Sequence, residues 1–314
     1  GSGGAGGDGG NAGDGSGGIG GDGGTGGSAT NGAGGHGGDG GSAINGAGGS
    51  GGGGGAGAGG AAGNDGASGS DTTHTGAPGG IGIVSGGGSS VTVCGQVGGG
   101  LSAYGGVRAP ALQFNGGGNT LTLQVGYAFS GAVGGGAGDT LALGGASTTS
   151  CPGATDGSFD VAAIGSTFEG FGRFAKTGPS TWTLTGNNTA TLWSVESGTL
   201  RVNGSIGGAT ASAGTLGGSG AAGAITLEAG GLVAPGNSPG TLHGTSLVWH
   251  GGGGMAFELD ASPAGSDLLQ LAGTLGKGVG SGFVFHFSDG AAPPQAGTYP
   301  LITFASQSGF AASD

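Results

Sequence analysis

The chain has 314 residues, 96 of them glycine; only 7% are charged, and the formal net charge is −12. Hydrophobic residues make up 34%, too few for a large round core but enough for a thin core built from a few side chains per repeat. The five basic residues are scattered, which argues against nucleic-acid binding, and the acidic balance argues against adsorption to anionic membranes.

Residues 1–75 form a glycine-rich, low-complexity segment without lysine, arginine, proline or aromatic residues. Its other residues often fall at every third position, as Ala5, Asp8, Asn11 and Asp14 do. Two interpretations stay open. The segment is either a disordered linker or tail, or a bundle of polyglycine-II-like strands, in which a three-residue turn places every third side chain on one edge.

Short alternating strands begin at Ile81. Residues 116–123 return as residues 136–143, with Asn119 and Asp139 in equivalent places 20 residues apart. Further alternating segments follow at 159–164, 181–184, 199–202, 224–227 and 240–242. Because repeats of this length bury their apolar side chains only by stacking, we predict an all-β fold, a β-solenoid over residues 76–260. The side chains expected to point inward are Leu121, Leu123, Leu141, Leu143, Val161, Leu184, Leu200, Val202, Ile225, Leu227 and Leu242.

Residues 261–314 are expected to form a C-terminal β cap of the solenoid. Segments 255–259, 268–271, 283–287 and 299–304 are longer and richer in aromatic residues than the earlier repeats. This enrichment favours a sturdier end with antiparallel pairing.

Two cysteines, Cys94 and Cys151, are 57 residues apart. In one column of regular coils they would lie roughly 14 Å apart, from a strand spacing of ~4.8 Å, whereas a disulfide needs Cα atoms within about 7 Å. A bond therefore requires residues 148–156 to fold back, and a disulfide and two free thiols both stay open.

The chain from about Asn119 onward resembles the passenger domain of autotransporters, the self-secreting surface proteins of Gram-negative bacteria. The resemblance lies in residues 176–186, 195–206, 214–220 and 230–242, whose order is similar to the passenger-associated transport repeat. It implies a right-handed parallel β-helix and export across the outer membrane. The chain shows neither the family's C-terminal membrane barrel nor a signal peptide, so we expect a released, processed or truncated passenger.

Several patterns carry possible chemistry, and each has a simpler structural interpretation. Ser238 lies in a G-x-S-x-G pattern, but the following proline removes a backbone N–H that an oxyanion hole needs, which favours a turn. Asp139 nearly matches a calcium-binding nonapeptide, but it arrives one residue early and no aspartate column repeats, which favours a polar turn. Glu258 and Asp260 share one strand face, and paired carboxylates could serve glycoside hydrolysis, but no compelling partner lies beside them and Phe-Glu-Leu is common in this repeat, which favours an ordinary strand.

The remaining charged residues suggest no site. Arg173 and Lys176 near Glu169 are expected to form a solvated salt-bridge cluster. The histidines show no metal-ligand spacing; they are His36, His74, His243, His250 and His286. The glycine segment also carries aspartates that could recruit cations at an edge, although the pattern favours no metal site; they are Asp8, Asp14, Asp22 and Asp39.

The sequence therefore predicts a non-catalytic surface or extracellular β-helical protein that acts in adhesion, aggregation or as a filament or matrix component. We expect no catalytic, cofactor or metal site. Expected partners are other copies of the chain, bound head to tail, or host, cell-surface and matrix components, with no nucleic acid and no membrane insertion. The alternative is a β-helix enzyme acting on polysaccharides, which would bring three or more carboxylates together in a cleft.

Overall fold

The computed structural model describes residues 79–101, 107–147, 151, 153–237 and 239–311. The expectations for residues 1–75 lie outside these ranges. The described residues are all-β, with 26 strands and two 3-10 helices of one turn each. None of those helices has the length and apolar content of a membrane span. The chain divides into two compact units, residues 1–142, 147–153 and 164–173, and residues 143–146, 154–163 and 174–314.

The first unit contains three short parallel ladders. One has the order β1-β4-β7-β10, a second contains β2, β5 and β8, and a third pairs β3 with β6. Their bounds are β1 Ile83–Ser85, β2 Ser90–Val93, β3 Gln96–Gly98, β4 Leu112–Phe114, β5 Thr120–Leu123, β6 Ala128–Ser130, β7 Val133–Gly134, β8 Thr140–Gly144 and β10 Phe168–Glu169.

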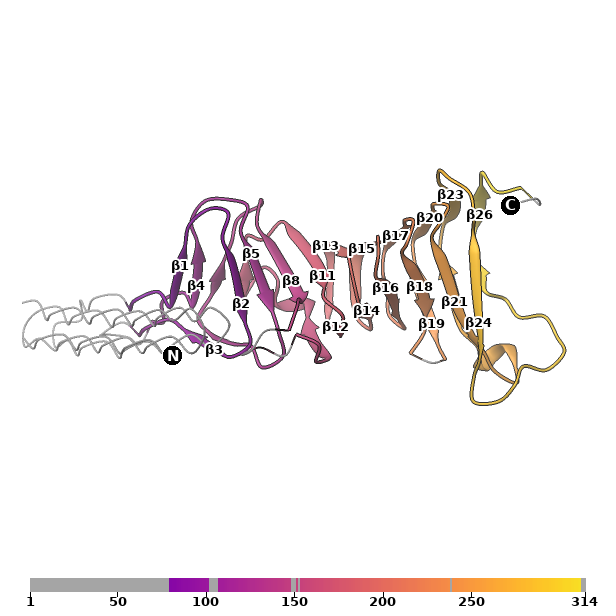
Figure 1. The fold of residues 1–314 in the computed structure, drawn as a ribbon, viewed down its shortest axis with the longest axis horizontal. Coiled ribbons are helices and arrows are strands. Elements are labelled where there is room, and N and C mark those ends of the chain that lie inside the picture. The colour runs from indigo at the N-terminus through magenta and orange to yellow at the C-terminus, as the bar shows by residue number, and fades with distance from the viewer. Residues whose placement is uncertain (1–78, 102–106, 148–150, 152, 238, 312–314) are drawn as a thin grey trace, which may run out of the picture. The chain divides into compact units, whose positions relative to one another are not determined.

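The second unit also contains three parallel ladders, two of seven strands and one of three, and its labelled strands follow one another in Figure 1. Their orders are β9-β12-β14-β16-β18-β21-β24, then β11-β13-β15-β17-β20-β23-β26, and β19-β22-β25. The first seven are β9 Gly157–Asp160, β12 Thr181–Thr185, β14 Thr199–Val202, β16 Thr215–Gly218, β18 Leu232–Pro235, β21 Gly254–Leu259 and β24 Val284–Asp289. The next seven are β11 Arg173–Thr177, β13 Asn187–Val195, β15 Ser205–Ala211, β17 Ala224–Leu227, β20 Ser246–Trp249, β23 Thr274–Lys277 and β26 Ser306–Ser308. The last three are β19 Thr241–Gly244, β22 Leu268–Leu271 and β25 Ile302–Thr303.

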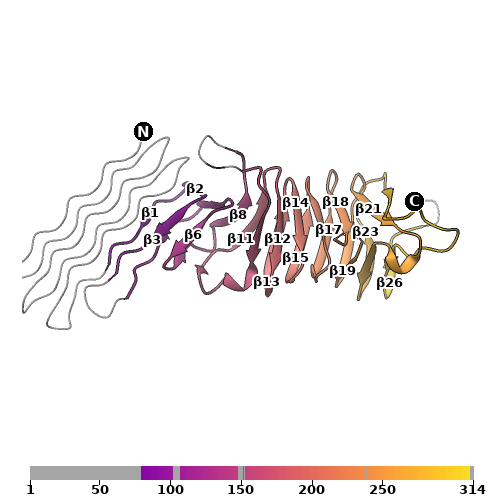
Figure 2. The ribbon, with the colours of Figure 1, turned by 90° about the horizontal axis from the view of Figure 1, so that it is seen from below.

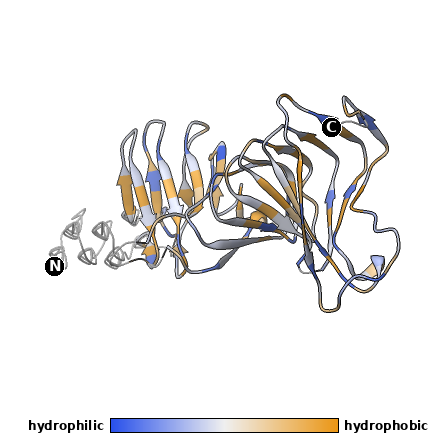
Figure 3. Ribbon diagram, turned by 45° about the vertical axis from the view of Figure 1, so that its right-hand side comes forward, coloured by the Kyte–Doolittle hydropathy of each residue, from blue (hydrophilic) through white to orange (hydrophobic). Residues whose placement is uncertain are grey.

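Parallel pairing in register stacks each inward side chain on its counterpart in the next coil. Trp182 pairs with Leu200, Leu200 with Leu216, and Leu216 with Val233. All four are buried. Figure 2 shows β13, β15 and β17 following the same stacking, and Figure 3 shows apolar residues along the strands. All eleven residues predicted to point inward are at most 1% exposed, which confirms the core assignment. The long parallel ladders are compatible with a β-solenoid.

The segment predicted as one strand over residues 159–164 is shorter than expected. Strand β9 ends at Asp160, and Val161–Ala163 form a 3-10 turn, η1. Asp160 accepts the amide N–H of Ala162 through Oδ1 at 2.9 Å, a local bond that competes with ladder pairing. Val161 is nevertheless fully buried, so the turn keeps the inward side chain in place.

The expectation of antiparallel pairing after residue 260 is wrong for the described strands. Strands β24, β25 and β26 pair parallel with β21, β22 and β23. The aromatic residues do gather here: the Trp249 ring lies 5.2 Å from both Phe283 and Phe285, between ring centroids. Trp249 is buried, but Phe285 and Phe287 on β24 are exposed. The aromatic enrichment therefore clusters on parallel strands and does not mark a reversal of chain direction.

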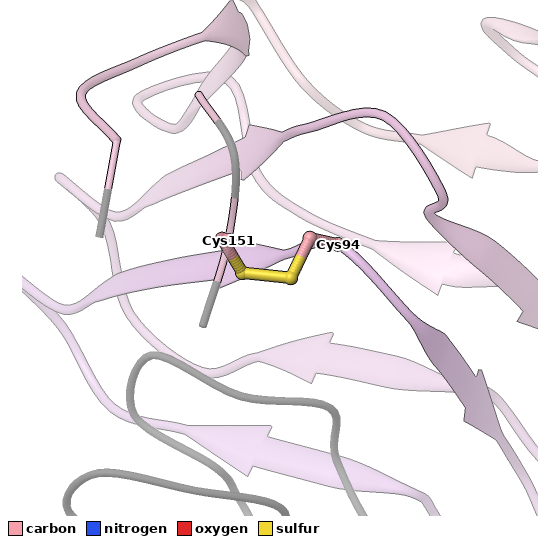
Figure 4. Close-up of a disulfide and its surroundings, with 2 residues drawn as sticks. All are labelled: Cys94 and Cys151. Atoms are coloured by element: carbon pink, nitrogen blue, oxygen red, sulfur yellow. A yellow bond between two sulfur atoms is a disulfide. The ribbon is translucent and has the colours of Figure 1, made fainter. Parts of the chain in front are cut away.

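Cys94 and Cys151 form a disulfide in the first unit, with Cα atoms 5.7 Å apart (Figure 4). Cys151 is fully buried. The structure thus resolves the alternative that the sequence left open in favour of the bond.

Candidate functional site

A hollow of about 300 Å³ lies on the outer face of the ladder β14-β16-β18-β21-β24. Its floor follows the strand register, with Arg201 beside Gly217 and Gly217 beside Ala234. Ala256 continues the floor on β21. A Cβ at Gly217 would approach the carbonyl oxygen of Ala234 to 2.6 Å, so glycine keeps the floor low. The hollow thus follows from small residues at outward positions of neighbouring coils.

Asp267 is a buried carboxylate that lines this hollow, and only 6% of the residue is exposed. Its Oδ2 accepts the N–H of Glu258 at 2.8 Å, and its Oδ1 accepts the N–H of Gly240 at 2.9 Å. A Cβ at Gly236 would lie 2.3 Å from Oδ1, and Gly236 has a φ of +88°, so glycine is required beside the carboxylate. Burial raises the pKa of Asp267, with a smaller contribution from the charge of Glu258, and the two backbone N–H groups oppose the rise.

The turn before Asp267 is held by hydrogen bonds of Ser266. Ser266 Oγ accepts the N–H of Asp260 at 2.9 Å and donates to the carbonyl of Ser262 at 2.9 Å. The 3-10 turn Pro263–Gly265, η2, lies between them. This hydrogen-bonded turn places the Asp267 carboxylate in the wall of the hollow.

Glu258 and Arg201 contribute opposite charges to the hollow. Glu258 is half-buried on β21 and Arg201 is exposed on β14. The hydroxyl-bearing residues that also line it are Thr199, Thr215 and Ser288. The hollow therefore offers both hydrogen-bond donors and acceptors.

Of the predicted carboxylate pair, Glu258 lines the hollow and Asp260 does not. Asp260 follows β21, and its Oδ1 accepts the N–H groups of Ala261 at 2.7 Å and Ala292 at 2.9 Å. It therefore ties two loops together, whereas the partner of Glu258 in the hollow is Asp267. Sequence alternation missed Asp267 because that residue comes from a turn and not from a strand. No local pattern in the sequence marks Asp267, since the glycine that leaves space for its carboxylate, Gly236, lies far earlier in the chain.

Asn119 and Asp139 form a ladder of turns in the first unit. Asp139 Oδ1 accepts the backbone N–H of Asn119 at 2.8 Å and its Nδ2–H at 3.0 Å, while Oδ2 accepts the N–H of Gly136 at 2.8 Å. Asn119 Oδ1 in turn accepts the N–H of Ser89 at 2.9 Å. Both side chains are fully buried. The near-match to a calcium motif is thus a polar turn in which protein donors occupy both carboxylate oxygens.

The predicted solvated cluster of Arg173, Lys176 and Glu169 is wrong for Lys176. Arg173 and Glu169 are exposed, but Lys176 is fully buried. Its Nζ donates to the carbonyls of Thr177 at 2.7 Å, Gly178 at 2.9 Å and Ser197 at 3.2 Å. Burial lowers the pKa of the ammonium to about 8, and the charge of Asp156 opposes that shift. Lys176 joins successive coils through their carbonyl groups.

The other sequence candidates do not assemble into a site. Ser238 lies outside the described residues, as do His36, His74 and the aspartates of the glycine segment. His250 lies 3.8 Å from Glu228, between Nε2 and Oε1. Within the described part of the chain, no three His, Cys, Asp or Glu side chains come together as metal ligands would.

Comparison of the chain with protein-family models, with curated proteins and with solved structures gives no match. The site geometry and the fold therefore carry the functional argument.

Proposed function

We propose that the chain is an exported, non-catalytic β-helical protein of the cell surface or extracellular space, acting in adhesion, aggregation or as a structural filament. In this proposal it is a right-handed parallel β-helix of the autotransporter passenger type, displayed outside the outer membrane of a Gram-negative bacterium. The observation that carries the proposal is the long parallel ladder with stacked inward side chains. Such a ladder extends by adding coils, and each coil adds outer surface for contacts.

The disulfide supports the extracellular part of the proposal. Disulfides form and persist in oxidising compartments, including the bacterial periplasm and the cell exterior, and are rare in the cytosol. The bond between Cys94 and Cys151 fits a chain that reaches such a compartment.

The strand edges support self-association. Strand β24 is the last member of its ladder, and all six of its residues are exposed. An exposed strand edge offers N–H and C=O groups for pairing with another chain. Head-to-tail contacts between copies produce open fibres when the rotation does not close. The partner that we propose for this edge is a second copy of the chain.

The hollow favours binding over hydrolysis. Two carboxylates line it, Glu258 and Asp267, whereas the enzyme alternative calls for three or more that converge. Asp267 is also held by two backbone N–H groups, which suits a fixed acceptor.

Light scattering and electron microscopy of the purified chain across protein concentration test self-association, and adhesion of protein-coated beads to one another tests aggregation. We expect elongated particles that grow with concentration and beads that clump. A monomer at every concentration together with non-adherent beads would reject the proposal. New reducing ends released from a panel of polysaccharides would establish the enzyme alternative instead.

A further inference from the structure

The hollow on the outer face of the second unit has the dimensions of a small-ligand site. Its volume of about 300 Å³ falls at the lower end of the ~300–1,000 Å³ typical of such sites. Ala234 and Ala256 are half-buried on its floor, between the charged side chains of Arg201 and Glu258. A small apolar floor flanked by polar groups suits a flat ligand with polar edges.

The carboxylate of Asp267 has acceptor positions that a ligand could fill. A carboxylate offers about four acceptor positions, and the backbone N–H groups of Glu258 and Gly240 fill two of them. Burial is the largest influence on the pKa of Asp267 and raises it despite both hydrogen bonds. A hydrogen-bond donor entering the hollow would replace the hydrogen bonds that the carboxylate lost when it was removed from water.

Arg201 restricts what that donor is. This residue lines the same hollow, and a guanidinium group donates hydrogen bonds without accepting any. A metal ion or ammonium ligand would meet this positive charge, and an anionic ligand would meet the charges of Glu258 and Asp267. A hydroxyl group both donates and accepts, so a neutral polyhydroxylated ligand satisfies all three side chains without a net charge of its own.

We propose that the hollow binds a unit of a neutral saccharide. Its hydroxyl groups donate to the carboxylates of Glu258 and Asp267 and accept from Arg201, while its C–H face lies on Ala234 and Ala256. This inference rests on the proposed non-catalytic surface role and names the ligand class of that role.

The experiment is calorimetric titration of the full chain with neutral oligosaccharides of glucose, galactose, mannose and N-acetylhexosamines, and with trigalacturonate and CaCl2 as charged probes. We expect at least one neutral probe to bind and both charged probes to bind weakly or not at all. Glu258→Gln and Arg201→Gln should each weaken binding tenfold or more, and Ala256→Phe, which fills the hollow, should abolish it. The matched controls are Glu196→Gln and Arg173→Gln, at exposed positions outside the hollow.

Thermal melting of each variant shows that lost binding is not lost folding. Absence of binding across the neutral panel would overturn the saccharide site, as would equal losses in the control variants or preferential binding of trigalacturonate or calcium. None of these results touches the proposed scaffold role, which light scattering and bead adhesion test separately. Cleavage of a bound oligosaccharide, followed by its reducing ends, would keep the site but overturn the non-catalytic function.

Discussion

Asn119 donates both its backbone N–H and its side-chain N–H to one oxygen of Asp139, which lies 20 residues later in the chain. Both residues are buried, and the pair joins two successive turns. Asp139→Asn would place an N–H group among these donors or leave a bond unmade. We expect a loss of about 1–3 kcal/mol in the free energy of unfolding, since buried donors would lack an acceptor. Denaturant titration measures it, with exposed Glu169→Gln as the control that should change little.

Leu141→Asp should destabilise the protein by several kcal/mol. Leu141 is fully buried in β8, and an unpaired carboxylate there would lose its water without gaining a partner. Thermal melting checks the prediction against Val84→Asp, at a position that is 56% exposed. Equal melting midpoints for the two variants would place Leu141 outside the core.

Removal of the disulfide should lower stability. Cys94→Ser with Cys151→Ser frees a loop of 57 residues in the unfolded chain. Loss of such a bond typically costs about 2–5 kcal/mol. Denaturation of the oxidised protein, the reduced protein and the double variant measures the effect. The reduced protein and the double variant should have similar free energies of unfolding, and both should be lower than that of the oxidised protein. An unchanged stability on reduction would mean that the bond constrains neither state.

Lys176 predicts a rise in stability at alkaline pH. Its folded pKa of about 8 lies below the ordinary 10.5, so between these values the unfolded chain holds a proton that the native chain has lost. The free energy of unfolding therefore increases with pH across this window, and the gain is lost as pH falls through 8. The three carbonyl bonds favour the ammonium, so we expect a rise of only ~1–2 kcal/mol.

Denaturation of the natural protein and of Lys176→Met from pH 7 to 10.5 measures this effect. Methionine does not titrate, so the unfolding free energy of the natural protein minus that of the variant should increase with pH. A constant difference would show that the pKa of the Lys176 ammonium is not lowered in the folded protein.

The core of the coils could be predicted from the sequence because alternation in strands is local. Leu200 and Val202 point inward for the same reason as Leu121 and Leu123: the strand period of two combines with a stacked neighbour. The polar turn at Asp139 was also predictable, since its motif was misaligned for calcium. These features depend on a few adjacent residues.

The features that were missed depend on residues distant in the chain. Lys176 was expected in solvent because nothing nearby in the sequence shows that the carbonyl of Ser197 would face it. Asp267 reaches the hollow through a turn, and Gly236, far earlier in the chain, leaves the space for it. The parallel pairing of β24 likewise depends on β21 and not on its own aromatic composition.

The bond between Cys94 and Cys151 also decides how the protein would respond to a mechanical pull on its two ends. Tension passes through the sulfur atoms, so the chain between the two cysteines carries none of it. The cysteines are 57 residues apart, which is roughly 200 Å of extended chain. The disulfide keeps this part of the chain from extending. A chain under tension would therefore stay short over this segment for as long as the bond remains oxidised.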